Sequence, residues 1–377
     1  MSSNYDIVVV GIGGIGSAVI HALSRRGARV LGIDARGPAH ALGSSHGKTR
    51  IIRRAYFEHP DYVPLLDTCY DLWSRLEKDC RETLYLPYGL YLAGNPEGSI
   101  VAGVQDAQRL HGFGIEQFDA RDARQRWPQF RPDDDMTILF ERQAGYLLVE
   151  NCIRACISES HRHGADLLFD QPIEAWESLG EAGFRIRTGE CSFDCGSIVF
   201  CAGPWTSALI DIPGVALNVV RKPNFWLETG DPDLQVDRQC PAFGFETRHG
   251  FLYGIPSPDD AWLKTGNHDG GKTVDDPSHV DREIDPVGQE EMLRFVRRYT
   301  RSASPTLRNH TVCMYTMSSD SHFILDRHPD FHSVFVAAGF SGHGFKFAPL
   351  VGEVVADWSL DGSTRHPVAF LGLDRFR

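Results

Sequence analysis

The sequence predicts an α/β fold in which a discontinuous, Rossmann-like dinucleotide-binding domain carries an inserted domain of mixed β structure. A strand, a glycine-rich turn and a helix open the chain in YDIVVVGIGGIGSAVIHALSRRGARVLGID. The same succession returns near the end in SVFVAAGFSGHGFKFAPLVGEVVADW. Between these units, residues from about 215 to 320 alternate polar with apolar positions and contain Pro-Asp turns, which is typical of antiparallel strands.

The opening unit has all the features of a dinucleotide-binding βαβ motif. Residues 7–10 form a continuous apolar run, as expected of a parallel strand that is buried on both faces. Gly11, Gly13 and Gly16 follow in the spacing G-x-G-x-x-G, which permits a tight turn and lets a pyrophosphate approach a helix N-terminus. The second strand ends at Asp34, where a carboxylate can accept hydrogen bonds from an adenosine ribose. The motif is specific because strand, helix and acid accompany the glycines, but it leaves FAD and NAD open.

The spacing of apolar residues predicts the remaining elements. Helices are expected over residues 61–79, with Asp61 as the N-cap, over 149–166 and over 288–300. Residues 84–94 are expected to form strands joined by a turn, and 191–203 an alternating run that becomes a buried strand.

The two ends of the chain therefore belong to one domain. We predict an FAD-binding domain of residues 1–80, 150–215 and 320–377, and a substrate domain of residues 81–149 and 216–319. The pattern favours FAD over a nicotinamide cofactor, since flavin domains often accept inserted substrate modules.

Composition limits the possible partners and locations. The net charge of −12 gives no general attraction to nucleic acid. No apolar run reaches the roughly 18–20 residues needed to span a bilayer, and the N-terminus MSSNYD has no leader features. The nine cysteines form no disulfide framework, and Cys152 and Cys156 lie on an apolar helical stripe, where packing is favoured over metal binding. We expect a cytoplasmic protein without a metal site or a membrane partner.

Several basic residues lie in patterns that are compatible with a role inside a site as well as with exposure on the surface. Arg50 and Arg53 alternate with apolar residues in GSSHGKTRIIRRAY, which suits guanidinium groups that face a carboxylate or a cofactor. Alternation in WLKTGNH allows Lys264 to point away from solvent, although an exposed lysine is the more frequent case. Lys346 falls in the first turn of the last helix, an unfavourable place for a cation. Cys313 lies in an alternating strand, and a buried structural thiol is its ordinary explanation.

Four stretches together resemble the monomeric sarcosine oxidase and N-methyltryptophan oxidase family of flavin amine oxidases. They are GSSHGKTRIIR, WLKTGNH, TVCMYTMSSDSHFILDRHP and AAGFSGHGFKFAPLVGE, and the resemblance extends over nearly the whole chain. It implies oxidation of a C–H bond next to a neutral secondary amine, with a hydride equivalent passing to FAD. Hydrolysis of the imine and reoxidation by O₂, giving H₂O₂, would follow. The family name also implies a monomer.

The resemblance assigns a role to each matching residue. Cys313 would be bonded through its sulfur to the 8α-methyl carbon of FAD, with His46 and Arg50 against the flavin. Arg53 and Lys346 would clamp the substrate carboxylate. Lys264 would serve the reaction with O₂. The residues around the substrate amine would be Tyr253, His268 and Tyr315. Those at the cofactor would include Thr49, Gly342 and Gly344.

Two positions depart from the pattern of the family that the chain resembles. Gly244 stands where the sarcosine-oxidising members have a methionine over the substrate, so we expect a larger pocket and a substrate bulkier than sarcosine. Asn267 also replaces a tyrosine beside His268.

The alternative functions are an FAD-dependent dehydrogenase that reduces a carrier and a non-catalytic flavin subunit of a hetero-oligomeric oxidase. The basic residues argue against the second alternative, because a scaffold does not need them.

Overall fold

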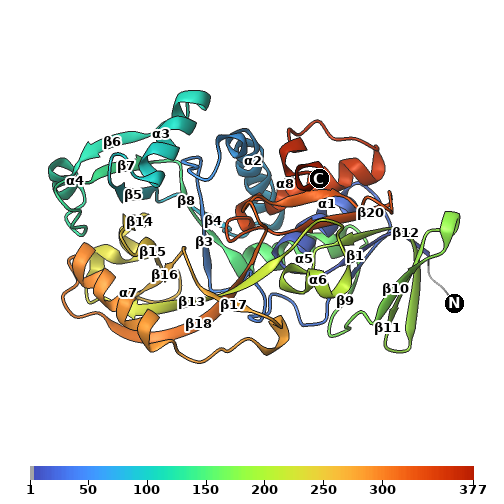
Figure 1. Cartoon of the computed structure of the whole chain (residues 1–377). Helices are drawn as coiled ribbons and strands as arrows, with labels where there is room; N and C mark the ends of the chain where they lie inside the picture. The colour runs from blue at the N-terminus through green and yellow to red at the C-terminus, as the bar shows by residue number, and fades with distance from the viewer. Residues whose placement is uncertain (1–3) are drawn as a thin grey trace.

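The computed structural model describes residues 4–377, and two large β-sheets organise it (Figure 1). The first sheet is built around β1 (Asn4–Val10), which runs parallel to β2 (Val30–Ile33) and to β12 (Cys191–Phe200). Strand β12 also pairs in parallel with β20 (Val334–Ala338), which comes from the far end of the sequence. The remaining strands of this eight-stranded sheet are β9 (Asp166–Leu168), β10 (Ala175–Ser178), β11 (Phe184–Thr188) and β19 (Ile324–Arg327).

Helices pack on the first sheet because its central strands are apolar on both faces. Helix α1 (Gly14–Arg25) packs against both α5 (Val149–Arg162) and α8 (Ala348–Leu360). Close approach of α1 and α8 requires Gly352, where an added Cβ would lie 2.6 Å from the carbonyl oxygen of Ala18. The neighbouring helices are α2 (Val63–Cys80) and the short α6 (Thr206–Leu209).

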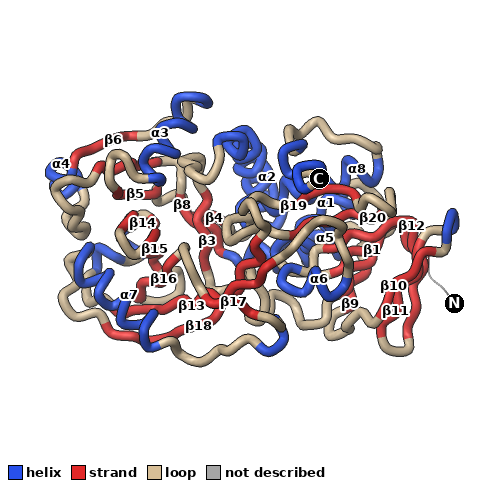
Figure 2. Tube along the Cα trace, in the orientation of Figure 1, coloured by secondary structure: helices blue, strands red, loops and turns tan. Residues whose placement is uncertain are grey.

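The second sheet has nine strands, and among residues 4–377 the α-helices α3 (Ser99–His111), α4 (Ala120–Arg126) and α7 (Pro286–Tyr299) pack on it. Its long strands β13 (Asn218–Glu228) and β18 (Thr306–Met317) pair antiparallel and reach towards the first sheet (Figure 2). The other strands are β5 (Leu90–Gly94), β6 (Glu116–Asp119), β7 (Thr137–Glu141), β14 (Ala242–Thr247), β15 (Gly250–Pro256), β16 (Trp262–Asn267) and β17 (Lys272–Val274).

A third, small sheet contains β3 (Thr49–Ile52), β4 (Tyr85–Leu86) and β8 (Gly145–Leu148). The strands expected within residues 84–94 therefore exist, but β4 and β5 belong to different sheets. Each large sheet draws on separated parts of the sequence, as a discontinuous domain with an insertion would. The boundaries given to the two domains stay a prediction.

The predicted cap of the helix over residues 61–79 is wrong. A 3₁₀ turn, η1 (Pro60–Tyr62), precedes α2, and His59 caps this turn by accepting a hydrogen bond from the backbone N–H of Asp61 at 3.3 Å. Asp61 thus lies inside the turn. Across residues 4–377 no helix combines the length and apolar character needed to traverse a bilayer.

Candidate functional site

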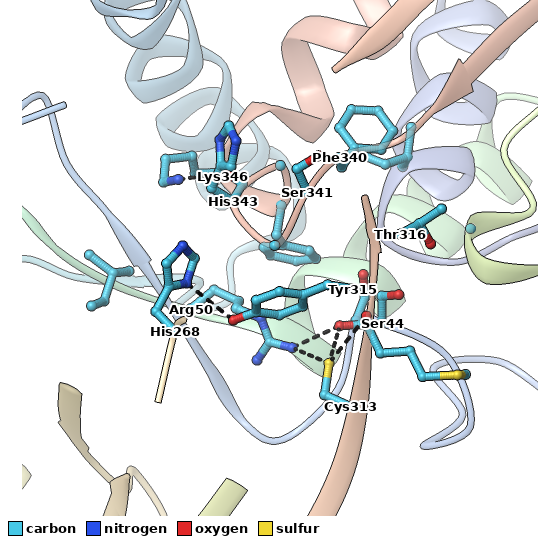
Figure 3. A pocket seen from close by; sticks show the side chains of 18 of the residues that line it. Ser44, Arg50, His268, Cys313, Tyr315, Thr316, Phe340, Ser341, His343 and Lys346 are labelled. Carbon is cyan, nitrogen blue, oxygen red and sulfur yellow. Dashed lines mark hydrogen bonds between the residues drawn. The ribbon is translucent and has the colours of Figure 1, made fainter. Parts of the chain in front are cut away.

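A cavity opens where the two large sheets meet, and segments from all along the chain line it. Strand β18 contributes Cys313 and Tyr315, and the glycine-rich turn after β20 contributes residues 342–346. Figure 3 shows these side chains around the space, with Arg50 and His268 beside them. Strands far apart in sequence therefore converge on one site.

A second cavity adjoins the first at the glycine-rich turn that follows β1. Ser44, Ser45, Cys201 and Gly203 line both cavities, so the two form one elongated space. An elongated space that begins at a βα turn suits an extended dinucleotide.

The backbone of this turn explains why glycine is required at two positions. Gly11 has a φ of 92°, and an added Cβ would lie 2.6 Å from the carbonyl oxygen of Cys201. A Cβ at Gly16 would lie 1.8 Å from the carbonyl oxygen of Gly11, so α1 could not approach the turn. Asp34 lines the second cavity, and its Oδ2 accepts a hydrogen bond from the backbone N–H of Ile12 at 2.6 Å. The carboxylate is thereby fixed at the end of the second strand.

Cys313 lies on β18 with its sulfur among basic groups. Nη2 of Arg50 donates a hydrogen bond to the sulfur at 3.4 Å, and the thiol donates to the carbonyl oxygen of Ser44 at 3.0 Å. A guanidinium therefore contacts this sulfur directly. Cys201 lines the same cavity, but burial raises the pKa of its thiol. Of these two cavity cysteines, Cys313 has the surroundings of a reactive one.

Arg53 is held at the cavity wall by residues that follow it in the sequence. Its Nη2 donates to both carboxylate oxygens of Glu58, at 2.6 and 2.8 Å, and its Nη1 donates to the carbonyl oxygen of Ala55. The guanidinium carbon lies 4.6 and 4.2 Å from the ring centroids of Tyr56 and Phe57. Burial alone would raise the pKa of Glu58, but Arg53 and nearby cations lower it to about 2, so this carboxylate stays ionised.

Lys346 completes a cationic corner with Arg53. It lies in the 3₁₀ turn η7 (Phe345–Phe347), just before α8, and its Nζ donates to the carbonyl oxygen of His343 at 2.6 Å. Burial and the charge of Arg53 lower the pKa of Lys346 to about 7, while Glu58 opposes this shift. The corner holds two cations against one carboxylate.

Lys264 is buried on β16, contrary to the more frequent exposed case. Only 1% of the residue is accessible, and its Nζ donates to the carbonyl oxygens of Gly47 and Thr49 at 2.8 and 2.9 Å. Burial and the charge of Arg50 lower the pKa of Lys264 well below its usual value. A negative group in the cavity would stabilise its ammonium form.

Tyr253, His268 and Tyr315 form another part of the cavity lining, called the polar wall below, across from the cationic corner of Arg53 and Lys346. Tyr253 donates its hydroxyl hydrogen to Oδ1 of Asn224 at 2.6 Å. The hydroxyl of Tyr315 lies 3.3 Å from Nδ1 of His268 (Figure 3). Burial lowers the pKa of His268 to about 4, so this imidazole is neutral near pH 7. The wall therefore offers neutral hydrogen-bonding groups opposite two cations.

Comparison with known proteins agrees with this geometry. Residues 6–358 match the family model described as FAD dependent oxidoreductase. The chain is 37% identical to monomeric sarcosine oxidase from Streptomyces avermitilis over 374 residues, which cover 98% of this chain and 97% of that protein. It is 34% identical to N-methyl-L-tryptophan oxidase from Yersinia pestis over 380 residues, 99% of this chain and 100% of that one. The chain belongs to this family of FAD-dependent oxidoreductases.

Solved structures share the fold of this FAD-dependent oxidoreductase. NikD, an unusual amino acid oxidase essential for nikkomycin biosynthesis, matches in its open form with a TM-score of 0.86 and 22% identity over 98% of both chains. L-proline dehydrogenase from P. horikoshii matches with a TM-score of 0.84 and 19% identity, over 100% of this chain and 98% of that one. The predicted fold class and the family resemblance are confirmed.

The lining of the elongated space fits FAD. Within residues 4–377, the buried Nε2 of His46 and the buried Oγ1 atoms of Thr49 and Thr316 have no hydrogen-bond partner. Buried polar atoms are normally paired, and Thr49 and Thr316 line the first cavity, where a flavin ring can supply partners. Gly13 lines the second cavity, and an added Cβ there would meet nothing within 4 Å, which leaves room for a pyrophosphate.

Most of the predicted site residues line the two cavities. Gly16, His46 and Gly244 do not: Gly16 packs against Gly11, and the carbonyl oxygen of His46 accepts a hydrogen bond from Arg50 at 2.8 Å. The second cavity receives Gly11, Gly13 and Asp34. The first receives Thr49, Arg50, Arg53, Tyr253, Lys264, His268, Cys313, Tyr315, Gly342, Gly344 and Lys346.

Two glycines predicted at the cofactor have a packing role in addition. An added Cβ at Gly342 would lie 2.3 Å from the ring of Tyr315, and one at Gly344 would lie 2.4 Å from the ring of Phe340. Both glycines therefore let an aromatic side chain of the cavity wall pack against the turn.

The predicted enlargement of the pocket at Gly244 requires correction. Gly244 is not part of the cavity wall, and an added Cβ would lie 2.3 Å from two ring atoms of Phe251. The ring of Phe251 thus occupies the space that a side chain at position 244 would take. It lines the cavity and packs edge-to-face on Phe57, with the ring centroids 5.4 Å apart. An aromatic wall stands where open volume was expected.

Sequence reasoning missed five residues around the site: Phe57, Glu58, Lys222, Asn224 and Phe251. Lys222 and Asn224 are two apart on β13 and therefore share a face, a signal visible in the stretch RKPNFW. The other three became recognisable only when β15 and the segment after β3 met at the cavity.

Proposed function

We propose that this protein is an FAD-dependent oxidase of a secondary amine that bears a carboxylate. The substrate is an N-methyl or cyclic amino acid bulkier than sarcosine, and the products are an imine, its hydrolysis products and H₂O₂. The observation that carries this proposal is the convergence of Cys313, Lys264, Arg53 and Lys346 on one cavity. The relatives named for sarcosine and N-methyl-L-tryptophan support the substrate class.

Cys313 is proposed to hold FAD through a bond from its sulfur to the 8α carbon. Arg50 supports this attachment because its guanidinium donates a hydrogen bond to the sulfur, which puts a cation beside the reacting atom. Thr49 and Thr316 would satisfy their free Oγ1 atoms on the cofactor, and His46 would hold Arg50 beside it through its carbonyl oxygen. When bound, FAD supplies the redox chemistry: it accepts a hydride equivalent from the substrate and passes electrons to O₂.

Arg53 and Lys346 bind the substrate carboxylate in this proposal. Glu58 now occupies Arg53, so the incoming carboxylate takes the place of a carboxylate that the protein itself provides. This exchange keeps the guanidinium paired in both states, while Lys346 remains a cation near the displaced Glu58 carboxylate. Binding also brings a second carboxylate to the corner that Lys346 shares with Glu58.

The polar wall selects the neutral amine. His268 is uncharged, and Arg53 and Lys346 add positive charge, so an ammonium group would meet no compensating anion except Glu58. Tyr315 and His268 can hydrogen-bond the amine and orient its neighbouring C–H bond. Phe57 and Phe251 provide an apolar surface for a side chain on the α-carbon, which sarcosine does not have.

Lys264 serves the reaction with O₂. Its ammonium would stabilise the anion formed when O₂ takes the first electron, an electrostatic effect that is large in a buried site. The alternative is a dehydrogenase that reduces a carrier, as in the name of the proline-oxidising structural neighbour. Release of H₂O₂ under air distinguishes the two.

The proposals on oligomeric state, cellular location and domain boundaries have more general support. A monomer agrees with the name of the sarcosine-oxidising relative, and a cytoplasmic location agrees with nine free cysteines. The division into residues 1–80, 150–215 and 320–377 against residues 81–149 and 216–319 agrees with the composition of the two large sheets.

A panel of secondary amino acids tests the function. The purified protein should be yellow, and at least one N-methyl or cyclic amino acid should bleach it anaerobically and yield H₂O₂ in air. Primary amines of equal size should react far more slowly. A colourless protein, or a yellow one that no member of the panel reduces, would contradict the proposal.

A further inference from the structure

Lys222 is a buried cation beside the candidate site that none of the roles above uses. It lies on β13 directly opposite Cys313 on β18. Side chains of directly paired residues in antiparallel strands lie on the same face, so Lys222 points to the side of the sheet that carries Cys313 and Tyr315. Only 5% of the residue is accessible to solvent. A cation buried to this degree needs a structural or functional reason.

The contacts of Lys222 link two parts of the polar wall. Its Nζ donates to the carbonyl oxygens of His268 and Asp269, at 2.7 and 2.9 Å. The same Nζ lies 5.0 Å from the ring centroid of Tyr315, within the range of a cation–π contact. The ammonium therefore connects the backbone that carries His268 with the face of the Tyr315 ring.

These contacts fix the pair that faces the substrate amine. His268 follows β16 and Tyr315 lies on β18, and one 3.3 Å contact between Nδ1 and the hydroxyl joins their side chains. The ring of His268 has further neighbours in Phe251, whose ring centroid is 6.2 Å away, and in Asp269 on the same loop. Lys222 is the group that contacts both members of the pair, one through its backbone and one through its ring.

We propose that Lys222 is a positioning residue that holds His268 and Tyr315 in the arrangement required for oxidation of the amine. This inference rests on the proposed function, because it assumes that the pair faces the substrate. Lys222 acts through its neighbours and does not line the cavity itself.

The charge of Lys222 has a second consequence for His268. Burial is the main cause of the lowered pKa of His268; Lys222 and Arg53 lower it further, whereas Glu58 and Asp269 raise it. His343, on the turn after β20, also interacts with His268 and is itself neutral near pH 7. Removing the ammonium would therefore raise the pKa of His268 and protonate it more readily at low pH.

Flavin reduction in the yellow holoenzyme tests the positioning role. Lys222→Met removes the charge and the donors, Lys222→Arg restores both, and Lys272→Met on neighbouring β17 is the matched control because Lys272 is exposed. We expect Lys222→Met to slow the limiting anaerobic rate by about tenfold to a hundredfold, as small misplacements at reacting centres do, and Lys222→Arg to recover most of it. Acetate binding, read from the flavin spectrum, should stay within about twofold because Arg53 and Lys346 are untouched.

The pKa of His268 gives a readout that does not need turnover. Histidine-selective ¹⁵N NMR of the holoenzyme, assigned with His268→Gln, should show His268 titrating at higher pH in Lys222→Met than in the unaltered protein or in Lys272→Met. Lys222→Gln replaces Lys222→Met in both experiments if the latter does not accumulate as yellow protein.

The outcomes separate the two hypotheses. An unchanged limiting rate, or a loss of acetate binding in parallel with the rate, would overturn the positioning role. If no secondary amine reduces the unaltered protein, the proposed function fails, and the role of Lys222 in amine oxidation fails with it. The NMR comparison then decides only whether the ammonium of Lys222 acts on His268: an unshifted His268 would refute that interaction as well.

Discussion

The two ends of the elongated cavity are built in opposite ways. At the Gly11 end, the glycine turn and the carboxylate of Asp34 lie within residues 10–34, and residues 39–45, 171–173 and 201–209 contribute most of the rest of the wall. At the Cys313 end, the wall consists of buried side chains, and its cations come from separated segments. A backbone site is specified by local spacing, whereas a side-chain site exists only once the sheets have met.

The backbone-built end should tolerate no side chain at Gly16. In Gly16→Ala the new Cβ would lie 1.8 Å from the carbonyl oxygen of Gly11, so α1 must move away from the turn. We expect the free energy of unfolding to fall by about 3 kcal/mol and the FAD content to drop severely. Thermal unfolding and the flavin-to-protein ratio measure both effects.

Gly37→Ala is the matched control for this variant. A Cβ at Gly37 would meet nothing within 4 Å, and the residue follows Asp34 by three positions. The control should keep its colour and stability. Equal melting temperatures for the two variants would show that the close approach of α1 to the turn does not require a glycine at position 16.

At the other end, one side chain should decide whether FAD is covalently held. Cys313→Ala should leave a protein whose flavin stays in the supernatant when the protein is precipitated with acid, while the unaltered protein pellets with its colour. Cys201→Ala is the control, since Cys201 is buried in the same cavity and its thiol has a raised pKa. A coloured pellet from Cys313→Ala would place the linkage on another residue.

The same contrast explains how much the sequence could predict. Gly11, Gly13, Gly16 and Asp34 were recognised from spacing alone, because the strand, turn and helix that position them are contiguous. At the other end, the family resemblance selected residues that line the cavity, but residue patterns alone favoured an exposed Lys264. Burial of that lysine depends on where β16 meets the loop before β3, which is a tertiary property.

Gly244 illustrates why the resemblance has limits. The absence of a side chain was read as free volume, yet Phe251, on the paired strand β15, fills it. Gly244 and Phe251 lie seven positions apart and become neighbours only through the hairpin. A single-residue comparison cannot detect a neighbouring ring that fills the space, whereas the register of two strands can.

The cationic corner should respond strongly to the loss of Arg53. In Arg53→Met, we expect acetate, read from the flavin spectrum, to bind about a hundredfold more weakly, because one partner of a buried charge pair is gone. Stability should also fall by about 3 kcal/mol, because Glu58 is left buried and unpaired. Arg54→Met is the control: Arg54 pairs with the exposed Asp67 and does not line the cavity.

A double variant separates these two effects of Arg53. Arg53→Met combined with Glu58→Gln removes the unpaired charge, so stability should recover while acetate binding stays weak. Recovery of binding in the double variant would mean that Glu58 repels the ligand and that Arg53 is not its partner.

The smallest expected effect is a pH dependence of acetate binding at the cationic corner. The pKa of Lys346 is lowered from its usual value to about 7, so the ammonium is present below that pH and is lost as the pH rises above it. Acetate is ionised throughout this range, so its affinity should be constant below about pH 7 and fall by at most about tenfold per pH unit above it. A bound anion raises the pKa of Lys346, so the decline should begin at higher pH in the complex. Lys222, whose pKa is lowered to about 8, titrates nearby, and Lys346→Arg distinguishes the two: the guanidinium keeps its charge, so the decline should vanish if Lys346 causes it.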